Sequence, residues 1–145
     1  MKNSVDVHDY MVKRPVLVSP ETELFEAIHK MIRHKLSGVT VVDDEHHPVG
    51  MLSELDCLRA ILSGTYYGEE VGTILVKDHM APNVECVASH ADVIDVAQSM
   101  LDHKHRRRPV INDQNQVIGQ LTCRAILKAV KDFDVPKRWF EGGRR

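Results

Sequence analysis

The chain has 145 residues, of which 43% are hydrophobic and 28% charged, and its formal net charge at pH 7 is −2. This composition is typical of a globular protein and leaves room for one modest domain or two small repeated units. No apolar run is long enough to cross a membrane, the N-terminal sequence MKNSVDVHDY is too polar for a signal peptide, and the three cysteines are far apart. We therefore expect a reduced, cytoplasmic protein that does not associate with membranes.

The first group of elements is predicted between residues 15 and 62. The apolar stretch PVLV (15–18) predicts a short strand. A helix with Thr22 as its N-cap is predicted next, because apolar residues follow at helical spacing: Leu24, Ala27, Ile28, Met31 and Ile32. Two strands, GVTVV (38–42) and VGML (49–52), are predicted on either side of the polar turn DDEHHP, and a second helix over ELDCLRAIL (54–62).

The second half of the chain repeats this order. VECV (84–87) predicts a strand, and Ile94, Ala97 and Leu101 predict a helix. RPVI (108–111) and VIGQL (117–121) flank the turn NDQNQ, and CRAILKAV (123–130) predicts the closing helix. Three pairs of matching residues are each 69 positions apart: Met11 and Met80, Gly50 and Gly119, Leu58 and Leu127. We place the repeats at 8–63 and 77–132, a linker at 64–76 and a C-terminal tail at 133–145.

Each repeat has the order β-α-β-β-α and is too short to bury much surface alone. We expect an α+β fold in which the two βαββα repeats pack sheet to sheet, share a core, and are related by a pseudo-twofold axis with symmetric clefts beside it. A cleft between two such halves is a natural place for a ligand. In the tail, Trp139 and Phe140 are expected to cover the core or to contact another subunit.

The segment SELD (53–56) allows two interpretations. Ser53 and Asp56 have the spacing of a capping box, in which the two side chains bond to backbone N–H groups at the start of a helix. The same helix start favours phosphate, and a fixed carboxylate there suits the paired hydroxyls of a ribose better than bare phosphate. The residues alone leave both interpretations open. The second repeat has Ala125 in place of Asp56, so the two copies are predicted to be unequal.

With TVVDDEHHPVGMLSELD in one copy and RRPVINDQNQVIGQLTCRA in the other, the chain resembles a tandem pair of cystathionine β-synthase (CBS) domains. The resemblance implies a Bateman-type module that binds adenine nucleotides or adenosyl compounds in the cleft between the repeats and acts as a sensor. It places the family's ribose-binding acid at Asp56 and its phosphate-side hydroxyls at Ser53 and Thr122. The family's basic residue falls near Arg106 and Arg107, where the first repeat has Ser37 and Gly38.

Two unequal clefts follow from the resemblance. The first is expected to bind AMP, ADP or ATP, with S-adenosylmethionine as an alternative, and its expected lining is Ser53, Leu55, Asp56, Val84, Cys86, His105, Arg106 and Arg107. The second cleft is expected to bind more weakly, and its expected lining is Pro15, Val16, Leu36, Ser37 and Thr122, together with Arg107.

Positive charge is concentrated in HKHRRR (103–108). Residues 1–75 carry 7 basic and 12 acidic side chains, whereas residues 76–145 carry 12 and 9. The run is interpreted either as cations at the C-terminal end of a helix or as an anion site. It is too short to make nucleic acid the expected partner. His46 and His47, next to Asp43, are interpreted as part of a polar turn rather than as a metal site.

No catalytic motif stands out: the sequence has no P-loop, nucleophile elbow or H-E-x-x-H. Cys57 and Cys123 follow the two helix-start hydroxyls, and we expect packed thiols there rather than thiols activated by the helix start. We expect a non-enzymatic regulatory module that requires no cofactor or metal, forms a homodimer through its second helices and acts on an unknown effector protein. The alternatives are a protein-interaction module with degenerate clefts, a metal enzyme built on the histidine-rich turn, and a nucleic-acid binder.

Overall fold

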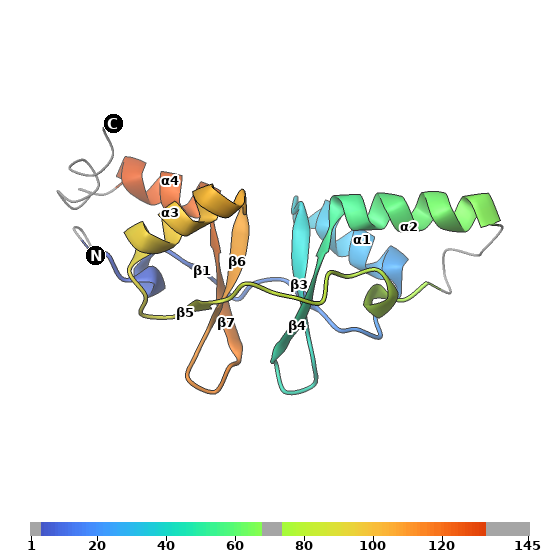
Figure 1. Cartoon of the computed structure of the whole chain (residues 1–145), viewed down its shortest axis with the longest axis horizontal. Coiled ribbons are helices and arrows are strands. Elements are labelled where there is room, and N and C mark those ends of the chain that lie inside the picture. Colours follow the sequence, from blue (N-terminus) through green and yellow to red (C-terminus); the bar gives the residue numbers. More distant parts are fainter. Residues whose placement is uncertain (1–3, 68–73, 133–145) are drawn as a thin grey trace. The chain divides into compact units, whose positions relative to one another are not determined.

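The structure, a computed structural model, describes residues 4–67 and 74–132. These residues form two compact units (Figure 1). The first-repeat unit contains residues 16–67 and 74–84, and the second-repeat unit contains residues 4–15 and 85–132. The described residues form two sheets and four α-helices, so the α+β class predicted from the sequence is confirmed.

The first-repeat unit contains a three-stranded sheet with the order β2-β3-β4. Its elements are β2 (Leu17–Val18), α1 (Leu24–Arg33), β3 (Gly38–Val42), β4 (Pro48–Ser53), α2 (Glu54–Tyr67) and the 3-10 helix η3 (Val76–Asp78). Strand β3 pairs in parallel with β2 and antiparallel with β4, and Gly38 lies opposite Ser53. Strand β4 therefore delivers the chain directly into α2, with Ser53 at the junction.

The core of this unit is formed by the helices against the sheet. Helix α1 contributes Leu24, Ala27 and Met31, which are buried as the helical spacing predicts. Ile32 departs from that prediction, because 73% of it is exposed. Ile74 and Val76, which lie after α2 in the sequence, complete the buried cluster.

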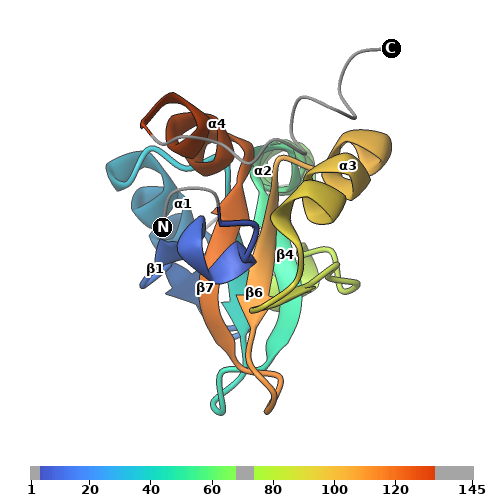
Figure 2. The same cartoon turned by 90° about the vertical axis from the view of Figure 1, so that its left-hand side faces the viewer.

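The second-repeat unit contains a four-stranded sheet with the order β1-β7-β6-β5. Its elements are η1 (Val7–Asp9), β1 (Val12–Lys13), β5 (Val87–Ala88), α3 (Val93–His103), β6 (Arg107–Ile111), β7 (Val117–Thr122) and α4 (Cys123–Asp132). Figure 2 faces this unit and shows α3 and α4 on the same side of the sheet. Leu101 on α3 was predicted to lie on the apolar face of this helix, but 72% of it is exposed. It occupies the position that matches Ile32 in the first repeat.

Each unit includes the N-terminal segment of the other repeat. Strand β1 lies before the first repeat's strands, yet it pairs with β7. Ala81 lies before the second repeat's strands, yet it forms a bridge with Met51. The sulfur of Met11 lies over Gly119 and that of Met80 over Gly50, where a Cβ would come within 2.5 Å and 2.4 Å of them. The boundaries of the compact units therefore differ from those of the sequence repeats. Gly50 and Gly119 occupy matching positions because each leaves room for a methionine sulfur.

Two local predictions were wrong. Thr22 does not cap α1: Glu23 holds the N-cap position without a side-chain bond, and the Thr22 hydroxyl accepts a hydrogen bond from Ser19 N instead. Helix α2 continues to Tyr67, into the residues predicted as a linker. The rest of the linker up to residue 73 and the tail with Trp139 and Phe140 lie outside the described residues. The predicted packing of sheet on sheet between the repeats stays a prediction.

Candidate functional site

The start of α2 forms a complete capping box. The Ser53 backbone N–H donates to Asp56 Oδ2 at 2.9 Å, and the Asp56 N–H donates to Ser53 Oγ at 3.1 Å. Glu54 N–H donates to the Ser37 carbonyl at 3.0 Å, which ties the helix start to the beginning of β3. The first of the two interpretations of SELD is therefore confirmed as geometry. The hydrogen bond from the Ser53 N–H holds the Asp56 carboxylate in one orientation.

The Asp56 side chain is mostly buried, with 17% of it exposed, and its Oδ1 atom lies 3.1 Å from Arg59 Nη1. Arg59 is a turn further along the same helix and its side chain is 71% exposed. A carboxylate has about four acceptor positions on its two oxygens. One backbone donor and one exposed arginine leave Asp56 able to accept further hydrogen bonds, so the capping role and a ligand role are compatible.

The second repeat has the hydroxyl N-cap but lacks the carboxylate that would complete a capping box. The Ala125 N–H donates to Thr122 Oγ1 at 2.9 Å, as Asp56 N–H does to Ser53. Cys123 N–H donates to the Arg106 carbonyl at 3.0 Å, as Glu54 N–H does to Ser37. The backbone of the two helix starts is thus equivalent, and the missing carboxylate is the main chemical difference predicted from the sequence.

The residues predicted for the first cleft are divided between the two units. Ser53, Leu55, Asp56 and Val84 belong to the first-repeat unit, and Cys86, His105, Arg106 and Arg107 to the second-repeat unit. The set predicted for the second cleft is divided as well: Val16, Leu36 and Ser37 on one side, Pro15 and Thr122 on the other. Within a unit, Ser53 and Asp56 are in contact, and Arg107 lies opposite Thr122 on paired strands. That the two groups share one cleft stays a prediction.

The basic run divides at the end of α3. His103 is the last helical residue and its Nδ1 lies 2.8 Å from the Ser99 carbonyl, while Lys104 ends the helix in the left-handed conformation. The predicted position at the end of a helix therefore holds for these two residues. It is wrong for Arg107 and Arg108, which are part of β6.

Arg108 is a buried cation that sequence reasoning missed. It is 4% exposed, its Nε donates to His105 Nδ1 at 3.1 Å, and its Nη2 has no hydrogen-bond partner among the described residues. Burial, helped by Arg108 and His103, lowers the pKa of His105. The repeat offset of 69 places Arg108 at the position of the core residue Val39, so comparing the two repeats could have predicted that Arg108 is buried.

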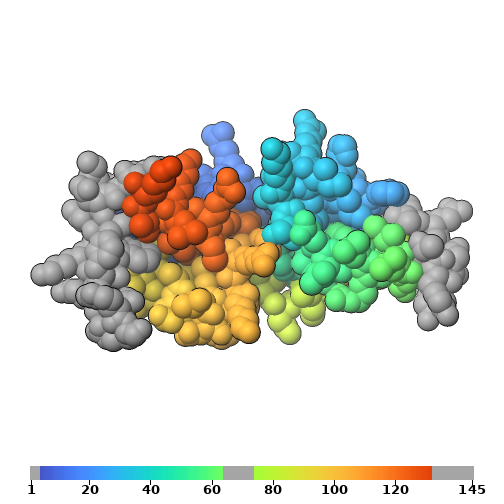
Figure 3. Space-filling view, turned by 90° about the horizontal axis from the view of Figure 1, so that it is seen from above, coloured from blue at the N-terminus to red at the C-terminus, as the bar shows by residue number. Residues whose placement is uncertain are grey.

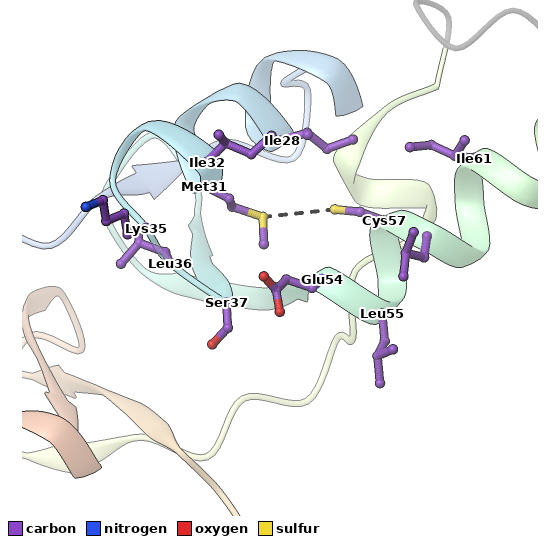
Figure 4. A pocket seen from close by; sticks show the side chains of 11 residues that line it. Ile28, Met31, Ile32, Lys35, Leu36, Ser37, Glu54, Leu55, Cys57 and Ile61 are labelled. Carbon is purple, nitrogen blue, oxygen red and sulfur yellow. Dashed lines mark hydrogen bonds between the residues drawn. The ribbon is translucent and has the colours of Figure 1, made fainter.

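A hollow of about 730 Å³ lies between α1 and α2 in the first-repeat unit (Figure 4). Its walls are mainly apolar: Ile28, Met31, Ile32, Leu36, Leu55, Leu58 and Ile61. Cys57 is buried there beside the sulfur of Met31, and burial raises its pKa to about 11. The Cys57 thiol is therefore packed and not activated, as expected.

The histidine-rich turn is organised by hydrogen bonds. Asp43 Oδ1 accepts from the N–H groups of Glu45 and His47, and Asp43 Oδ2 lies 3.3 Å from His47 Nδ1. Within residues 4–67 and 74–132, no group of three or more His, Cys, Asp and Glu side chains is arranged to hold a metal ion. None of the described helices combines the length and the hydropathy needed to cross a membrane.

A family model described as "CBS domain" matches the chain twice, over residues 7–63 and 76–132. The chain belongs to the CBS-domain family. Because the model matches twice, the chain carries a tandem CBS pair, as its resemblance indicated.

Curated relatives share this pair within longer chains. CBSX2, a chloroplastic CBS domain-containing protein of Arabidopsis thaliana, is 27% identical over 154 residues, which take in 85% of this chain and 62% of CBSX2. An inosine-5'-monophosphate dehydrogenase of Methanocaldococcus jannaschii is 32% identical over 123 residues, which take in 85% of this chain and 23% of the dehydrogenase. The chain therefore spans less than two thirds of the length of these two relatives.

The fold is that of solved CBS pairs. The crystal structure of Arabidopsis CBSX2 in complex with AMP matches with a TM-score of 0.76 and 28% identity, and the match covers 88% of this chain and 97% of that one. A putative acetoin utilization protein of Vibrio cholerae matches with a TM-score of 0.80 over 88% of this chain and 91% of its own, at 23% identity. This second likeness shows the fold alone.

Proposed function

We propose that this CBS pair is a non-catalytic regulatory module that binds an adenine nucleotide (AMP, ADP or ATP), with Asp56 at the start of α2 accepting from the ribose hydroxyls. The observation that carries the proposal is the mostly buried Asp56 carboxylate, which the Ser53 N–H holds at a helix N-terminus. The CBSX2 complex supports the choice of ligand, since that relative binds AMP.

The chemistry follows from the acceptor positions of Asp56. Two adjacent hydroxyls on a ribose are donors that can meet the two oxygens of one carboxylate, and hydrogen bonds to a charged group are stronger than neutral ones. Arg59 forms an ion pair with this carboxylate, and because the Arg59 side chain is exposed it can turn away from a ligand. Ser53 Oγ, at the positive end of α2, suits the phosphate side.

The rest of the ligand is assigned by the family pattern. The purine is proposed to lie near Val84 and Cys86, and Arg106 and Arg107 are proposed to neutralise the phosphates. His105 and Leu55 complete this proposed set. S-adenosylmethionine is the alternative ligand, because it also presents an adenosine ribose to Asp56.

A sensor must also change its state. Binding transmits a signal only if the ligand has different affinities for two conformations of the module. We propose that an effector protein responds to that difference.

Calorimetric titration tests the proposal, with AMP, ADP, ATP and S-adenosylmethionine added to the wild type and to Asp56→Ala. The wild type is expected to bind at least one adenine nucleotide. Loss of charge-assisted hydrogen bonds of about 1.5–3 kcal/mol is expected to weaken affinity in Asp56→Ala by roughly 10- to 150-fold.

Two controls separate binding from folding. Asp56→Asn keeps an acceptor oxygen for the Ser53 N–H and loses the charge, so it is expected to preserve the cap and still weaken binding. Asp92→Ala removes the N-cap of α3 and is expected to bind like the wild type. Equal affinity in the wild type and Asp56→Asn, or no binding of any of the four ligands, would contradict the proposal and favour a protein-interaction module.

A further inference from the structure

Arg108 carries a buried positive charge that no described side chain neutralises. It is 4% exposed, and no carboxylate of residues 4–67 and 74–132 lies within 4.0 Å of its guanidinium nitrogens. Its Nε donates to His105 Nδ1, whereas its Nη2 has no hydrogen-bond partner in the same part of the chain. A guanidinium keeps its charge in proteins, and a buried charge without a partner is strongly destabilising. An anion beside Nη2 would therefore stabilise the fold.

The Arg108 side chain lies on the face of the sheet that the helices cover. Arg108 is opposite Leu121 on the paired strands and shares its face of β6 with Val110. Both of these apolar residues belong to a buried cluster that also includes residues of α3 and α4. The surfaces of α3 and α4 adjoin on this unit (Figure 3).

His105 connects Arg108 to the start of α4. It lies just after α3, and its ring accepts the hydrogen bond from Arg108 Nε. The His105 carbonyl accepts from the Cys123 thiol, with 3.6 Å between oxygen and sulfur, and Cys123 is the first residue of α4. The Arg108 guanidinium is therefore next to the segment that joins the end of α3 to the start of α4.

The first turn of α4 is open to solvent and has no negative charge of its own. Cys123 and Arg124 are exposed, so Cys123 is not the packed thiol that the sequence predicted. The first turn of α4 contains no acidic residue, whereas that of α2 contains Glu54 and Asp56. The N-terminal end of a helix of this length favours an anion through its backbone N–H groups and its dipole. At α4, no acidic side chain of the first turn takes that role.

The charges around Arg108 are mainly positive. Three exposed cations lie on the segment before β6 and on the first turn of α4: Lys104, Arg106 and Arg124. The charge of Glu85 is the smallest of the four influences on the pKa of His105, and it opposes burial and the charges of Arg108 and His103. The described surroundings therefore attract an anion and do not supply one.

We propose that the Arg108 guanidinium and the N-terminal end of α4 bind a tetrahedral oxyanion such as inorganic phosphate, with Nη2 donating to one of its oxygens. Such an anion has acceptor oxygens in several directions, so it can accept from a guanidinium and from a helix start together. Because side chains alternate along β6, Arg108 and Arg107 lie on opposite faces of the sheet. This site is therefore distinct from the phosphate position proposed for Arg107, and it does not depend on nucleotide binding.

NMR spectra of the ¹⁵N-labelled protein test the proposal during a titration with inorganic phosphate, with sodium chloride keeping the ionic strength constant. Saturable shifts are expected for the Arg108 Nε–H group and for the backbone amides of His105, Cys123 and Arg124. An unchanged Arg108 Nε–H signal, or shifts that do not saturate, would overturn the proposal.

Two variants separate this site from general charge effects. Arg108→Lys keeps the positive charge and loses the planar fork of donors, so it is expected to raise the phosphate dissociation constant by roughly 10-fold or more. Arg33→Gln removes an exposed cation at the end of α1 and is expected to bind phosphate like the wild type. Equal phosphate affinity in the wild type and Arg108→Lys would contradict the proposed role of the guanidinium.

Adenosine and AMP distinguish a free anion from the phosphate group of a nucleotide. Phosphate alone is expected to saturate the response of the Arg108 Nε–H group, and adenosine is expected to leave this signal unchanged. A response to AMP without a response to phosphate would overturn the assignment to a free anion and leave the proposed nucleotide function intact.

Stability provides an independent measurement. Arg108→Val introduces the residue that the first repeat has at this position, Val39, so the variant is expected to fold. Urea unfolding is compared in phosphate and in chloride of equal ionic strength. Phosphate stabilises many proteins by exclusion from their surface, so the informative quantity is the extra stabilisation of the wild type over Arg108→Val. Equal stabilisation of both proteins by phosphate would overturn the proposal.

Discussion

At the scale of single residues, Asp56 and Ala125 account for the difference between the two repeats. Both helix starts have a hydroxyl cap, and only the first adds a carboxylate that returns a hydrogen bond to the backbone. The hydroxyl cap is common to both helix starts, so the proposed ligand role rests on the carboxylate that only the first one has. It also means that the stability role and the binding role of Asp56 can be measured apart.

Ala125→Asp is expected to complete the second capping box and raise the free energy of unfolding by about 0.5–1 kcal/mol. The carboxylate would accept from Thr122 N–H as Asp56 does from Ser53 N–H, near the positive end of α4. Urea unfolding followed by circular dichroism measures the change. Asp56→Ala is the matched reverse substitution and is expected to lower stability. A less stable Ala125→Asp would show that the two helix starts are not equivalent.

At the scale of elements, the N-terminal segment is held to the start of α3. Val7 N–H donates to the Ala91 carbonyl at 2.9 Å, and Val93 N–H donates to the Val5 carbonyl. Beside these bonds, Asp6 Oδ2 lies 2.8 Å from His90 Nδ1, and the His90 ring stacks on His8 with centroids 5.8 Å apart. The segment that carries β1 into the second-repeat sheet therefore has a titratable contact.

This contact is expected to depend on pH. The hydrogen bond to Asp6 raises the pKa of His90 above its ordinary 6.5, with support from the charges of Asp6, Asp113 and Asp9, against a smaller effect of burial. Stabilisation from His90 is therefore complete below pH 6.5 and lost as the pH rises through the raised pKa. The hydrogen bond from His90 lowers the pKa of Asp6 below 3.8, so its contribution is lost as the pH falls through that lowered value.

Hydrogen exchange of the Val7 amide measures this effect. After correction for the intrinsic exchange rate, protection is expected to be higher at pH 5.5 than at pH 8.5. His90→Gln is expected to remove the difference. Equal protection of the wild type at both pH values would show that the ion pair does not hold the segment.

At the scale of the whole molecule, the periodic parts of the sequence predicted most of the elements. Both helix pairs and both central hairpins are where the apolar spacing placed them, because each buries one face in a local core. The exchange of the segments around Met11 and Met80 was not predicted, since a two-residue strand has no periodicity to detect. Ile32 and Leu101 were assigned to the buried face of their helices although they are exposed, because helical spacing alone does not show where the edge of that face lies.

Within the candidate site, the structure confirms the predicted capping geometry at the start of α2. The Ser53–Asp56 geometry followed from a local motif that a few consecutive residues determine. Arg108 was missed because arginines in a basic run are normally exposed, and only the comparison with Val39 shows that this one occupies a core position. The shared cleft stays a prediction, because a site between two units would depend on contacts that no local pattern encodes.

Because each compact unit includes a segment of the other repeat, the unit boundaries predict which fragment of the chain folds by itself. Residues 16–84 contain the whole buried cluster of the first-repeat unit, whereas residues 1–63 follow the repeat boundary and lack Ile74 and Val76. Loss of two buried side chains of this size removes about 1.5–3 kcal/mol each. Fragment 16–84 is expected to unfold cooperatively in urea and fragment 1–63 to show no cooperative transition. The opposite result would contradict the boundaries of the units.

The central claim is that an adenine nucleotide binds at the start of α2 and does so because of Asp56. Amide NMR spectra of the ¹⁵N-labelled protein during an AMP titration test it most directly, because each residue reports separately. We predict saturable shifts for Ser53, Glu54, Leu55 and Asp56 and smaller shifts for Thr122 to Ala125. In Asp56→Asn, the shifts of the first group are expected to need a higher AMP concentration to reach half of their final size. Shifts centred on the second helix start, or shifts that Asp56→Asn leaves unchanged, would contradict the account.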